Sequence, residues 1–221
     1  MTITFDRSIF ESLPMKLTLT YFDFPFWRAE VSRLALFIGG IDFTDERPTR
    51  EEFKTLKESG VLPFGQLPTL EIDGVKYAQS IAIARFCGQI SGLYPKNNLI
   101  DALRVDELLD SISEINYALY PSMRETNAEK KLALRETFTM EVLPNWLKAI
   151  EARLLSNTES NYLVGEQLTI ADLALCRLIA WFTSGILDGV PKDVIKPYPS
   201  LVAHFELVES HPKVVEWMQK Y

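Results

Sequence analysis

The residue types most able to form a functional site are concentrated in one stretch near the start of the chain. Residues 21–27 read YFDFPFW and are followed directly by RAE, so five of seven consecutive side chains are aromatic. Aromatic residues make up 11% of the chain as a whole. The stretch is therefore either an unusually aromatic part of the core or the lining of a site. An aromatic lining would favour a flat or apolar ligand.

The two cysteines offer little chemistry of their own. Cys87 and Cys176 form neither a CxxC pair nor a spacing typical of metal ligands, so we expect no metal. We expect both to be reduced core residues of a cytoplasmic protein.

Composition excludes several classes of partner. Thirty acidic residues against 23 lysines and arginines give a net charge of −7, which disfavours binding to nucleic acid and to anionic membranes. The sequence has no apolar run long enough to span a membrane. Residues 1–14 lack the apolar run of a secretory signal, and we treat them as an N-terminal extension.

The first half of the chain alternates strand and helix patterns. Alternating polar and apolar residues predict strands, apolar residues at helical spacing predict helices, and Asp73-Gly74 predicts a hairpin. Thr49 and Glu52 form a capping box, and Ser80 is expected to cap the last helix. The predicted elements, in the order β-α-β-α-β-β-α, are 16–22, 31–38, 42–47, 49–59, 66–72, 75–78 and 80–92.

The second half, beyond a linker at 93–98, has only helix patterns. An apolar stripe between Val105 and Leu119 predicts an amphipathic helix near its start, and residues 129–155 fit another long helix. Thr169 and Asp172 form a further capping box. We therefore expect an α/β domain over 15–92 and an all-α helical bundle over 99–221.

An α/β unit of this order, with a proline immediately before its third strand, is thioredoxin-like. Pro68 is that proline. If the Leu67-Pro68 bond is cis, the Leu67 backbone would face outward and could pair with a peptide ligand. The redox members of this fold carry CxxC at the end of the first strand, where this chain has Tyr21 and Phe22. Disulfide exchange is therefore not expected.

Several segments together resemble the cytosolic glutathione transferases, and the tyrosine-type sigma class in particular. In order, these segments are YF near the end of the first strand, RAE, LPFGQLPTLEIDG, QSIAIARF and LTIADLAL, and the likeness covers nearly the whole chain from Met15. It implies glutathione as co-substrate and a homodimer. Tyr21 matches the residue that stabilises the glutathione thiolate, and Arg28 matches an arginine that adds positive potential beside it. A tyrosine is a weaker acid than a thiol, so Tyr21 would donate a hydrogen bond rather than act as a base.

Other positions match residues that bind glutathione in that family. Ser80, at a helix start, would hold the γ-glutamyl carboxylate. Phe53 stands where tryptophan is usual and lacks its N–H donor. Glu114 would reach the glutamyl ammonium bound by the neighbouring subunit. The full set of matched positions is Phe53, Lys57, Gln66, Leu67, Pro68, Gln79, Ser80 and Glu114.

The resemblance also implies a second pocket, for a small apolar electrophile, between the two domains. Pro25-Phe26-Trp27 replaces the Arg-Gly usual in sigma relatives and makes this loop one residue longer, which should narrow or re-aim the pocket mouth. Three activities stay open: conjugation, a prostaglandin synthase-like isomerisation, and a crystallin-like structural role. The expected lining residues are Phe22, Phe24, Phe26, Tyr117, Tyr120, Met123 and Phe182.

Overall fold

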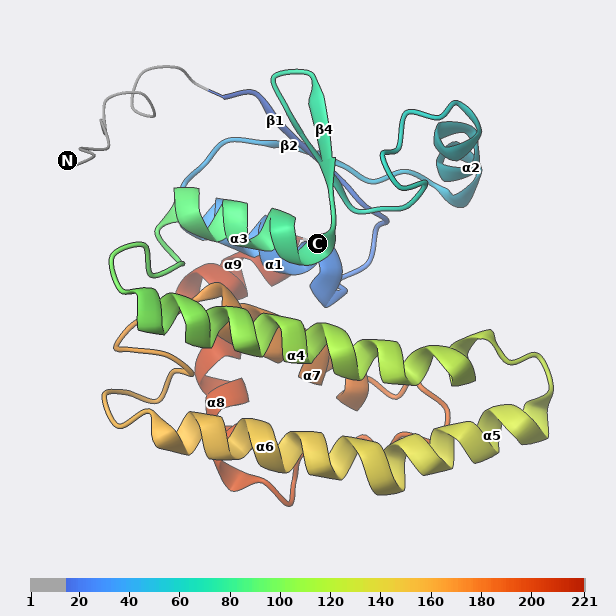
Figure 1. The fold of residues 1–221 in the computed structure, drawn as a ribbon, viewed down its shortest axis with the longest axis vertical. Helices are drawn as coiled ribbons and strands as arrows, with labels where there is room; N and C mark the ends of the chain where they lie inside the picture. Colours follow the sequence, from blue (N-terminus) through green and yellow to red (C-terminus); the bar gives the residue numbers. More distant parts are fainter. Residues whose placement is uncertain (1–14, 221) are drawn as a thin grey trace, which may run out of the picture.

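The structure is a computed structural model that describes residues 15–220. The predicted N-terminal extension, residues 1–14, lies outside the described residues. Figure 1 shows two parts of the molecule, one that mixes strands and helices and one that is all-helical. α1 and α3 lie between the sheet and the all-helical part. The predicted fold class, a thioredoxin-like domain followed by a helical bundle, is confirmed.

A four-stranded sheet in the order β2-β1-β3-β4 forms the centre of the α/β domain. β1 runs parallel to β2 and antiparallel to β3, and β3 and β4 form the hairpin predicted from Asp73-Gly74. The strands are shorter than the sequence patterns suggested, because pairing stops before the ends of the apolar runs. Their bounds are Leu17–Thr20 (β1), Thr44–Glu46 (β2), Thr69–Ile72 (β3) and Val75–Ala78 (β4).

Three helices complete this domain. α1 is buried along most of its length, because it packs against α3 on one side and against α7 of the helical domain on another. α2 has no buried residue and begins with the predicted capping box, in which Thr49 and Glu52 bond to each other's backbone. The helices are α1 (Trp27–Ile38), α2 (Arg50–Glu58) and α3 (Ser80–Ser91).

The start of α3 differs from the prediction. Ser80 was expected to cap this helix, but it is the first helical residue, and the preceding residue is Gln79 with a φ of 78°. That positive φ turns the chain into the helix one residue earlier than a serine cap would. Neither side chain caps the helix, so the first backbone N–H groups of α3 have no side-chain acceptor from Gln79.

The helical domain contains the long helices visible in the lower half of Figure 1. The apolar stripe predicted between Val105 and Leu119 faces the core on α4. The long helix expected over 129–155 is one continuous rod, α5 and α6, joined by a π-helical turn at Phe138–Val142. The helices are α4 (Leu99–Arg124), α5 (Ala128–Thr137), α6 (Leu143–Ser156), α7 (Ile170–Thr183), α8 (Pro199–Glu209) and α9 (Pro212–Lys220).

α7 runs through the centre of the helical domain and contacts α1, α4 and α8. Its first turn carries the predicted capping box between Thr169 and Asp172. The Asp172 carboxylate also accepts from the Leu163 backbone N–H at 2.7 Å and lies 2.9 Å from His204 Nε2. Because Asp172 is fully buried, this cap anchors the helix to the loop before it and to α8. Within the described residues, no helix is long and apolar enough to cross a membrane.

Candidate functional site

Tyr21 lies just beyond the end of β1, where the chain leaves the sheet and turns toward α1. Its side chain is 5% exposed, and its ring contacts those of Phe22 and Phe24 at centroid distances of 5.6 and 5.5 Å. Burial raises the pKa of the Tyr21 hydroxyl above its usual value, and the nearby charge of Arg28 offsets only part of that rise. Tyr21 is therefore protonated at neutral pH and available as a hydrogen-bond donor.

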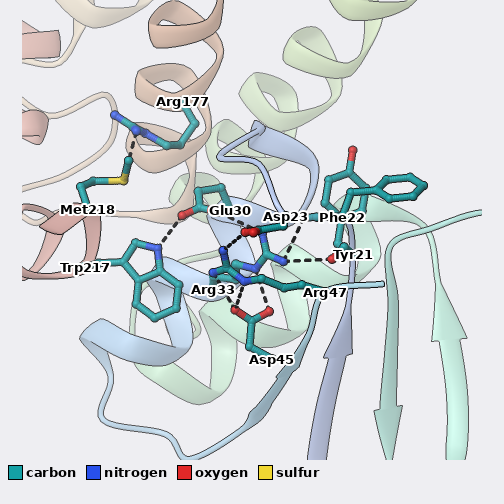
Figure 2. Close-up of polar contacts among 10 residues, drawn as sticks. All are labelled: Tyr21, Phe22, Asp23, Glu30, Arg33, Asp45, Arg47, Arg177, Trp217 and Met218. Carbon is teal, nitrogen blue, oxygen red and sulfur yellow. Dashed lines mark hydrogen bonds and ion pairs between the residues drawn. The ribbon is translucent and has the colours of Figure 1, made fainter. Parts of the chain in front are cut away.

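The segment that carries Tyr21 is held by a fully buried arginine on α1. Arg33 donates to the backbone carbonyls of Tyr21 at 3.2 Å and Phe22 at 3.3 Å, and it pairs with Glu30 and Asp45 at 3.2 and 2.9 Å. Figure 2 shows Arg33 in the middle of this cluster. The arginine thus bonds to the turn on one side and to carboxylates from α1 and β2 on the other, which fixes the position of Tyr21.

The Arg33 cluster extends in two directions. The Glu30 carboxylate also accepts a hydrogen bond from Trp217 Nε1 on α9, at 2.5 Å, so the last helix is tied to the first (Figure 2). Asp45 accepts from Arg47 Nε at 2.8 Å. Every charge in the buried part of the cluster has a partner of opposite sign, as a stable buried arrangement requires.

Arg28, at the start of α1, joins the two domains beside Tyr21. One guanidinium nitrogen donates to the Tyr120 hydroxyl on α4 at 2.5 Å. The guanidinium carbon also lies 5.3 Å from the Trp27 ring centre, 5.5 Å from that of Tyr117 and 5.6 Å from that of Tyr120. Within the described residues no carboxylate pairs with Arg28, so its positive charge remains available to an anion near Tyr21.

A cavity of about 740 Å³ opens between the two domains at this point. The β1–α1 connection, α4, α5, α7 and the segment after α7 all contribute to its walls. Its lining is Tyr21, Phe22, Phe24, Pro25, Phe26, Arg28, Arg50, Gln66, Leu67, Asn116, Tyr120, Met123, Lys131, Arg135, Arg177, Ala180, Trp181, Ser184, Ile186, Leu187 and Asp188.

One wall of the cavity is aromatic and is formed by Phe22, Phe24 and Phe26 of the β1–α1 connection together with Trp181. Phe26 packs edge-on against Trp181 of α7, with ring centroids 4.7 Å apart, so this loop closes against the helical domain. Phe24 is 44% exposed and stacks with Phe22. Trp27 is 2% exposed and belongs to the core rather than to the cavity wall.

Three polar residues on the cavity wall were not anticipated from the sequence. Asn116 is fully buried, and neither its amide nitrogen nor its amide oxygen has a partner among the described residues. Arg177 reaches away from Tyr21 toward Met218 (Figure 2) and pairs with Glu209. Arg135 is 2% exposed and lines the opposite end, near Asp188. Asn116 lies within the apolar stripe of α4, and that position could have revealed it.

Of the other residues expected to bind glutathione, two line this cavity. Gln66 and Leu67 line it beside Tyr21, and the Leu67–Pro68 peptide bond is cis. Ser80 is 7% exposed at the first turn of α3, with the exposed Gln79 before it. Neither Gln79 nor Ser80 lines the cavity itself.

The remaining expected glutathione contacts lie farther out. Phe53 on α2 packs edge-on against Phe22 at 5.2 Å, which places it next to the Tyr21 segment. Lys57, also on α2, is exposed, and its Cε would lie 3.6 Å from a Cβ at Gly65, beside Gln66. Glu114 is exposed on α4 and lies outside the cavity lining.

Two of the expected pocket residues do not line the cavity. Phe182 is fully buried and packs against Phe138 at 6.0 Å, while its neighbour Trp181 faces the cavity instead. Tyr117 is 52% exposed and contacts Arg28 and Tyr120 from outside. α7 is buried on nearly all sides, so apolar periodicity could not tell which of two adjacent aromatic residues faces the cavity. The cavity does bring together Tyr21, Phe22, Phe24, Phe26, Arg28, Tyr120 and Met123.

No group of histidine, cysteine and acidic side chains in the described part of the chain is arranged to hold a metal ion. Cys87 and Cys176 are both buried and unpaired, and burial raises the thiol pKa to about 12 and about 11, respectively. Neither cysteine is therefore suited to act as a nucleophile at neutral pH.

Comparisons with known proteins identify the family. Residues 17–89 match the family model of the glutathione S-transferase N-terminal domain, and residues 111–221 match that of the C-terminal domain. Glutathione S-transferase 1 of Ascaris suum is 32% identical, over 90% of this chain and 94% of the relative. Hematopoietic prostaglandin D synthase of Gallus gallus is 32% identical, over 91% of this chain and 94% of the relative. S-crystallin SL11 of Nototodarus sloanii is 30% identical, over 87% and 91%.

Solved structures agree with these sequence relatives. Prostaglandin synthase D of Nilaparvata lugens superposes with a TM-score of 0.82 at 29% identity, covering 93% of this chain and 98% of that one. A monomeric glutathione S-transferase from Necator americanus has a TM-score of 0.74 at 31% identity, covering 93% and 97%. Family models span both domains, and relatives above 30% identity cover most of the chain. The chain therefore belongs to the glutathione S-transferase family.

Proposed function

We propose that the protein conjugates glutathione to apolar, aromatic electrophiles, with Tyr21 donating a hydrogen bond to the glutathione thiolate. The observation that carries this proposal is the placement of a buried, protonated tyrosine at the wall of a largely aromatic cavity, beside an arginine with no carboxylate partner among the described residues. In the reaction, the thiolate sulfur forms a bond to the electrophilic carbon, and the leaving group departs with the bonding electrons.

The required stabilisation matches what one hydrogen bond supplies. A thiol with a pKa of about 8.5 is roughly 3% ionised at pH 7. Lowering that pKa by about two units makes the thiolate the main form and requires about 2.7 kcal/mol. A hydrogen bond to a charged acceptor contributes about 1.5–3 kcal/mol, and the charge of Arg28 adds to it. Because Tyr21 is the weaker acid, it keeps its proton while it donates.

Glutathione is proposed to lie across the sheet end of the cavity. The γ-glutamyl carboxylate would sit at the start of α3, where Ser80 and free backbone N–H groups favour an anion. The cysteinyl portion would pair with the Leu67 backbone beside Gln66 and Pro68, and the glycyl carboxylate would face Lys57 near Phe53. Gln79, with its φ of 78°, would contact the glutamyl end.

Assembly as a cytoplasmic homodimer is part of the proposal. Glu114 is exposed on α4 and free to reach glutathione bound by a second subunit, as the family resemblance implies. Two buried unpaired thiols fit a reducing compartment. The monomeric relative from Necator americanus makes the oligomeric state a question for direct measurement by sedimentation.

A glutathione-dependent isomerase is the second candidate. Two similar proteins are prostaglandin D synthases, and such an activity would use the same activated thiolate. A crystallin-like role without catalysis is the third, since an S-crystallin is also similar. A structural protein would have no need for Tyr21, Gln66, Gln79 and Ser80 together, which favours an enzyme.

Turnover of chlorodinitrobenzene, a neutral aromatic electrophile, tests the proposal when measured with the wild type and with Tyr21→Phe. We expect the variant to bind glutathione in calorimetry but to lose activity by up to about 25-fold at pH 7, which is the ratio of thiolate fractions for pKa values two units apart. The difference should shrink toward pH 9, where both thiols are ionised. Glutathione binding without turnover in the wild type would favour the isomerase, and a failure to bind glutathione would favour the structural role. Equal rates at pH 7 would exclude the tyrosine mechanism.

A further inference from the structure

Positive charge gathers around the cavity of a protein that is acidic overall. The chain carries a net charge of −7, yet five of the residues that line the cavity are cationic and one, Asp188, is acidic. Arg28 and Arg50 lie at the glutathione end. The others come from the helical domain, beyond the reach of the proposed glutathione site: Lys131, Arg135 and Arg177.

Among the cations that line the cavity, Arg135 has a buried positive charge that the fold leaves without an ion-pair partner in the described part of the chain. Its side chain is buried, and no described carboxylate forms an ion pair with it. Its hydrogen bonds are to neutral acceptors, the Ser122 hydroxyl at 3.0 Å and the Asp188 backbone carbonyl at 3.1 Å. Burial lowers the pKa of Arg135, and the charge of Asp188 opposes that change. A buried cation that lacks an anion is destabilising, so a ligand that supplies one gains affinity.

The surroundings of Arg135 hold it in one orientation. Ser122, which accepts from the guanidinium, itself donates to the Leu119 carbonyl at 2.7 Å. Gly189, with a φ of 77°, passes so close that a Cβ there would lie 2.8 Å from Arg135 Cγ. The Gly189 carbonyl is fixed in turn by the Thr139 hydroxyl at 3.1 Å. A guanidinium held on two sides loses little entropy when it binds a planar anion.

A second cation stands next to Arg135 on the same face of α5. Lys131 precedes it by four residues, lines the cavity, and pairs with the exposed side chain of Asp188 at 3.2 Å. Asp188 therefore both screens Lys131 and places a negative charge at the rim. The adjacent Lys130 is exposed and lies outside the lining, which makes it a matched control on the same helix.

We propose that the electrophile carries an acidic group, such as a carboxylate, which Arg135 binds with help from Lys131 while the apolar body lies against Phe24, Phe26 and Trp181. This inference rests on the proposed function and names its substrate class. It places the acidic group at the helical end of the cavity, so that the reacting carbon faces the thiolate end.

A matched pair of probes tests the inference: para-chloro-meta-nitrobenzoate and its neutral methyl ester. Calorimetry measures the binding of each to the glutathione-loaded protein, and chloride release measures turnover. Arg135→Met keeps the stem that packs on Gly189 and removes the charge. We expect this variant to weaken binding of the acid by about tenfold or more relative to the ester, as for a lost hydrogen bond to a charged group.

Three further variants guard against misfolding of Arg135→Met. Lys131→Gln should weaken binding of the acid by a few-fold, whereas Lys130→Gln should leave both probes unchanged. Asp188→Asn removes the one acid of the lining and releases Lys131, so it should strengthen binding of the acid and leave the ester unaffected. In each variant, the affinity and the turnover rate for the acid are divided by those for the ester. This ratio cancels the intrinsic difference in reactivity between the two probes.

The outcomes separate the two proposals. If the ester reacts but the ratio of acid to ester is the same in the wild type, Arg135→Met and Asp188→Asn, the substrate class is wrong and the transferase function stands. If neither probe reacts, the transferase proposal fails, and the binding measurements alone decide whether Arg135 binds the acidic group. Equal changes with Lys130→Gln and Lys131→Gln would also overturn the inference, because they would indicate a general surface-charge effect.

Discussion

Replacing Arg33 with methionine tests the idea that a buried ion cluster holds Tyr21 in place. The Arg33 side chain is 0% exposed, and its carboxylate partners Glu30 and Asp45 are 3% and 12% exposed. Removing one partner of a buried ion pair leaves an uncompensated charge and typically costs about 3–5 kcal/mol. For a chain of this size, each kcal/mol lowers the melting temperature by about 2–4 °C. We therefore expect the variant to melt about 6–20 °C below the wild type.

Urea denaturation gives the free energy directly, and two companion variants sharpen the result. Arg153→Met removes an exposed ion pair with Glu107 and should cost less than about 1 kcal/mol. Adding Glu30→Gln to Arg33→Met removes the stranded charge while keeping an acceptor for Trp217, so part of the lost stability should return. A loss below about 1 kcal/mol for Arg33→Met, equal to that of Arg153→Met, would show that the buried cluster adds no more stability than an exposed ion pair.

Three further predictions follow from individual side chains. Burial raises the pKa of Cys176 to about 11 and that of Cys87 to about 12, whereas the unfolded-state pKa of a cysteine is about 8.5. The protonated thiols therefore contribute stability below about pH 8.5, and the melting temperature should fall as the pH rises from about 8.5 toward 11. Cys176→Ala removes one of these thiols and should show a shallower decline of the melting temperature with pH. Asn116→Leu replaces a buried amide without partners, so urea denaturation should show a gain of about 1–2 kcal/mol, and a loss would mean that the amide is satisfied in solution. Ser80→Ala should weaken glutathione binding in calorimetry by about fivefold or more without changing the pKa of the bound thiol, and equal affinity would remove Ser80 from the proposed site.

Local sequence signals predicted most of the architecture. The capping boxes at Thr49 and Thr169 and the Asp73-Gly74 turn are formed by residues close in sequence, and all three are present. Ser80 was assigned as a cap because serine favours that position, but the positive φ of Gln79 places it inside the helix. A backbone angle imposed by the tertiary fold cannot be read from the types of two residues.

The candidate site was only partly predictable. Tyr21 and Arg28 could be located because the neighbouring sequence motifs fix their place in the β1–α1 connection and at the start of α1. Arg135 could not, because its burial depends on the loop at Gly189, more than fifty residues away, closing over its stem. Phe182 was expected in the pocket, but its neighbour Trp181 lines the cavity, because the rotation of the largely buried helix α7 is set by α1 and α4 rather than by its own apolar pattern.

The near-ultraviolet absorbance of the glutathione thiolate reports directly whether Tyr21 stabilises that thiolate in the bound state. The absorbance is recorded against pH for the glutathione complexes of the wild type and of Tyr21→Phe. We expect a midpoint about two pH units below that of a free thiol in the wild type, and a midpoint close to the free value of about 8.5 in the variant. Tight binding without a thiolate signal at neutral pH, or the same midpoint in both proteins, would mean that Tyr21 does not stabilise the thiolate.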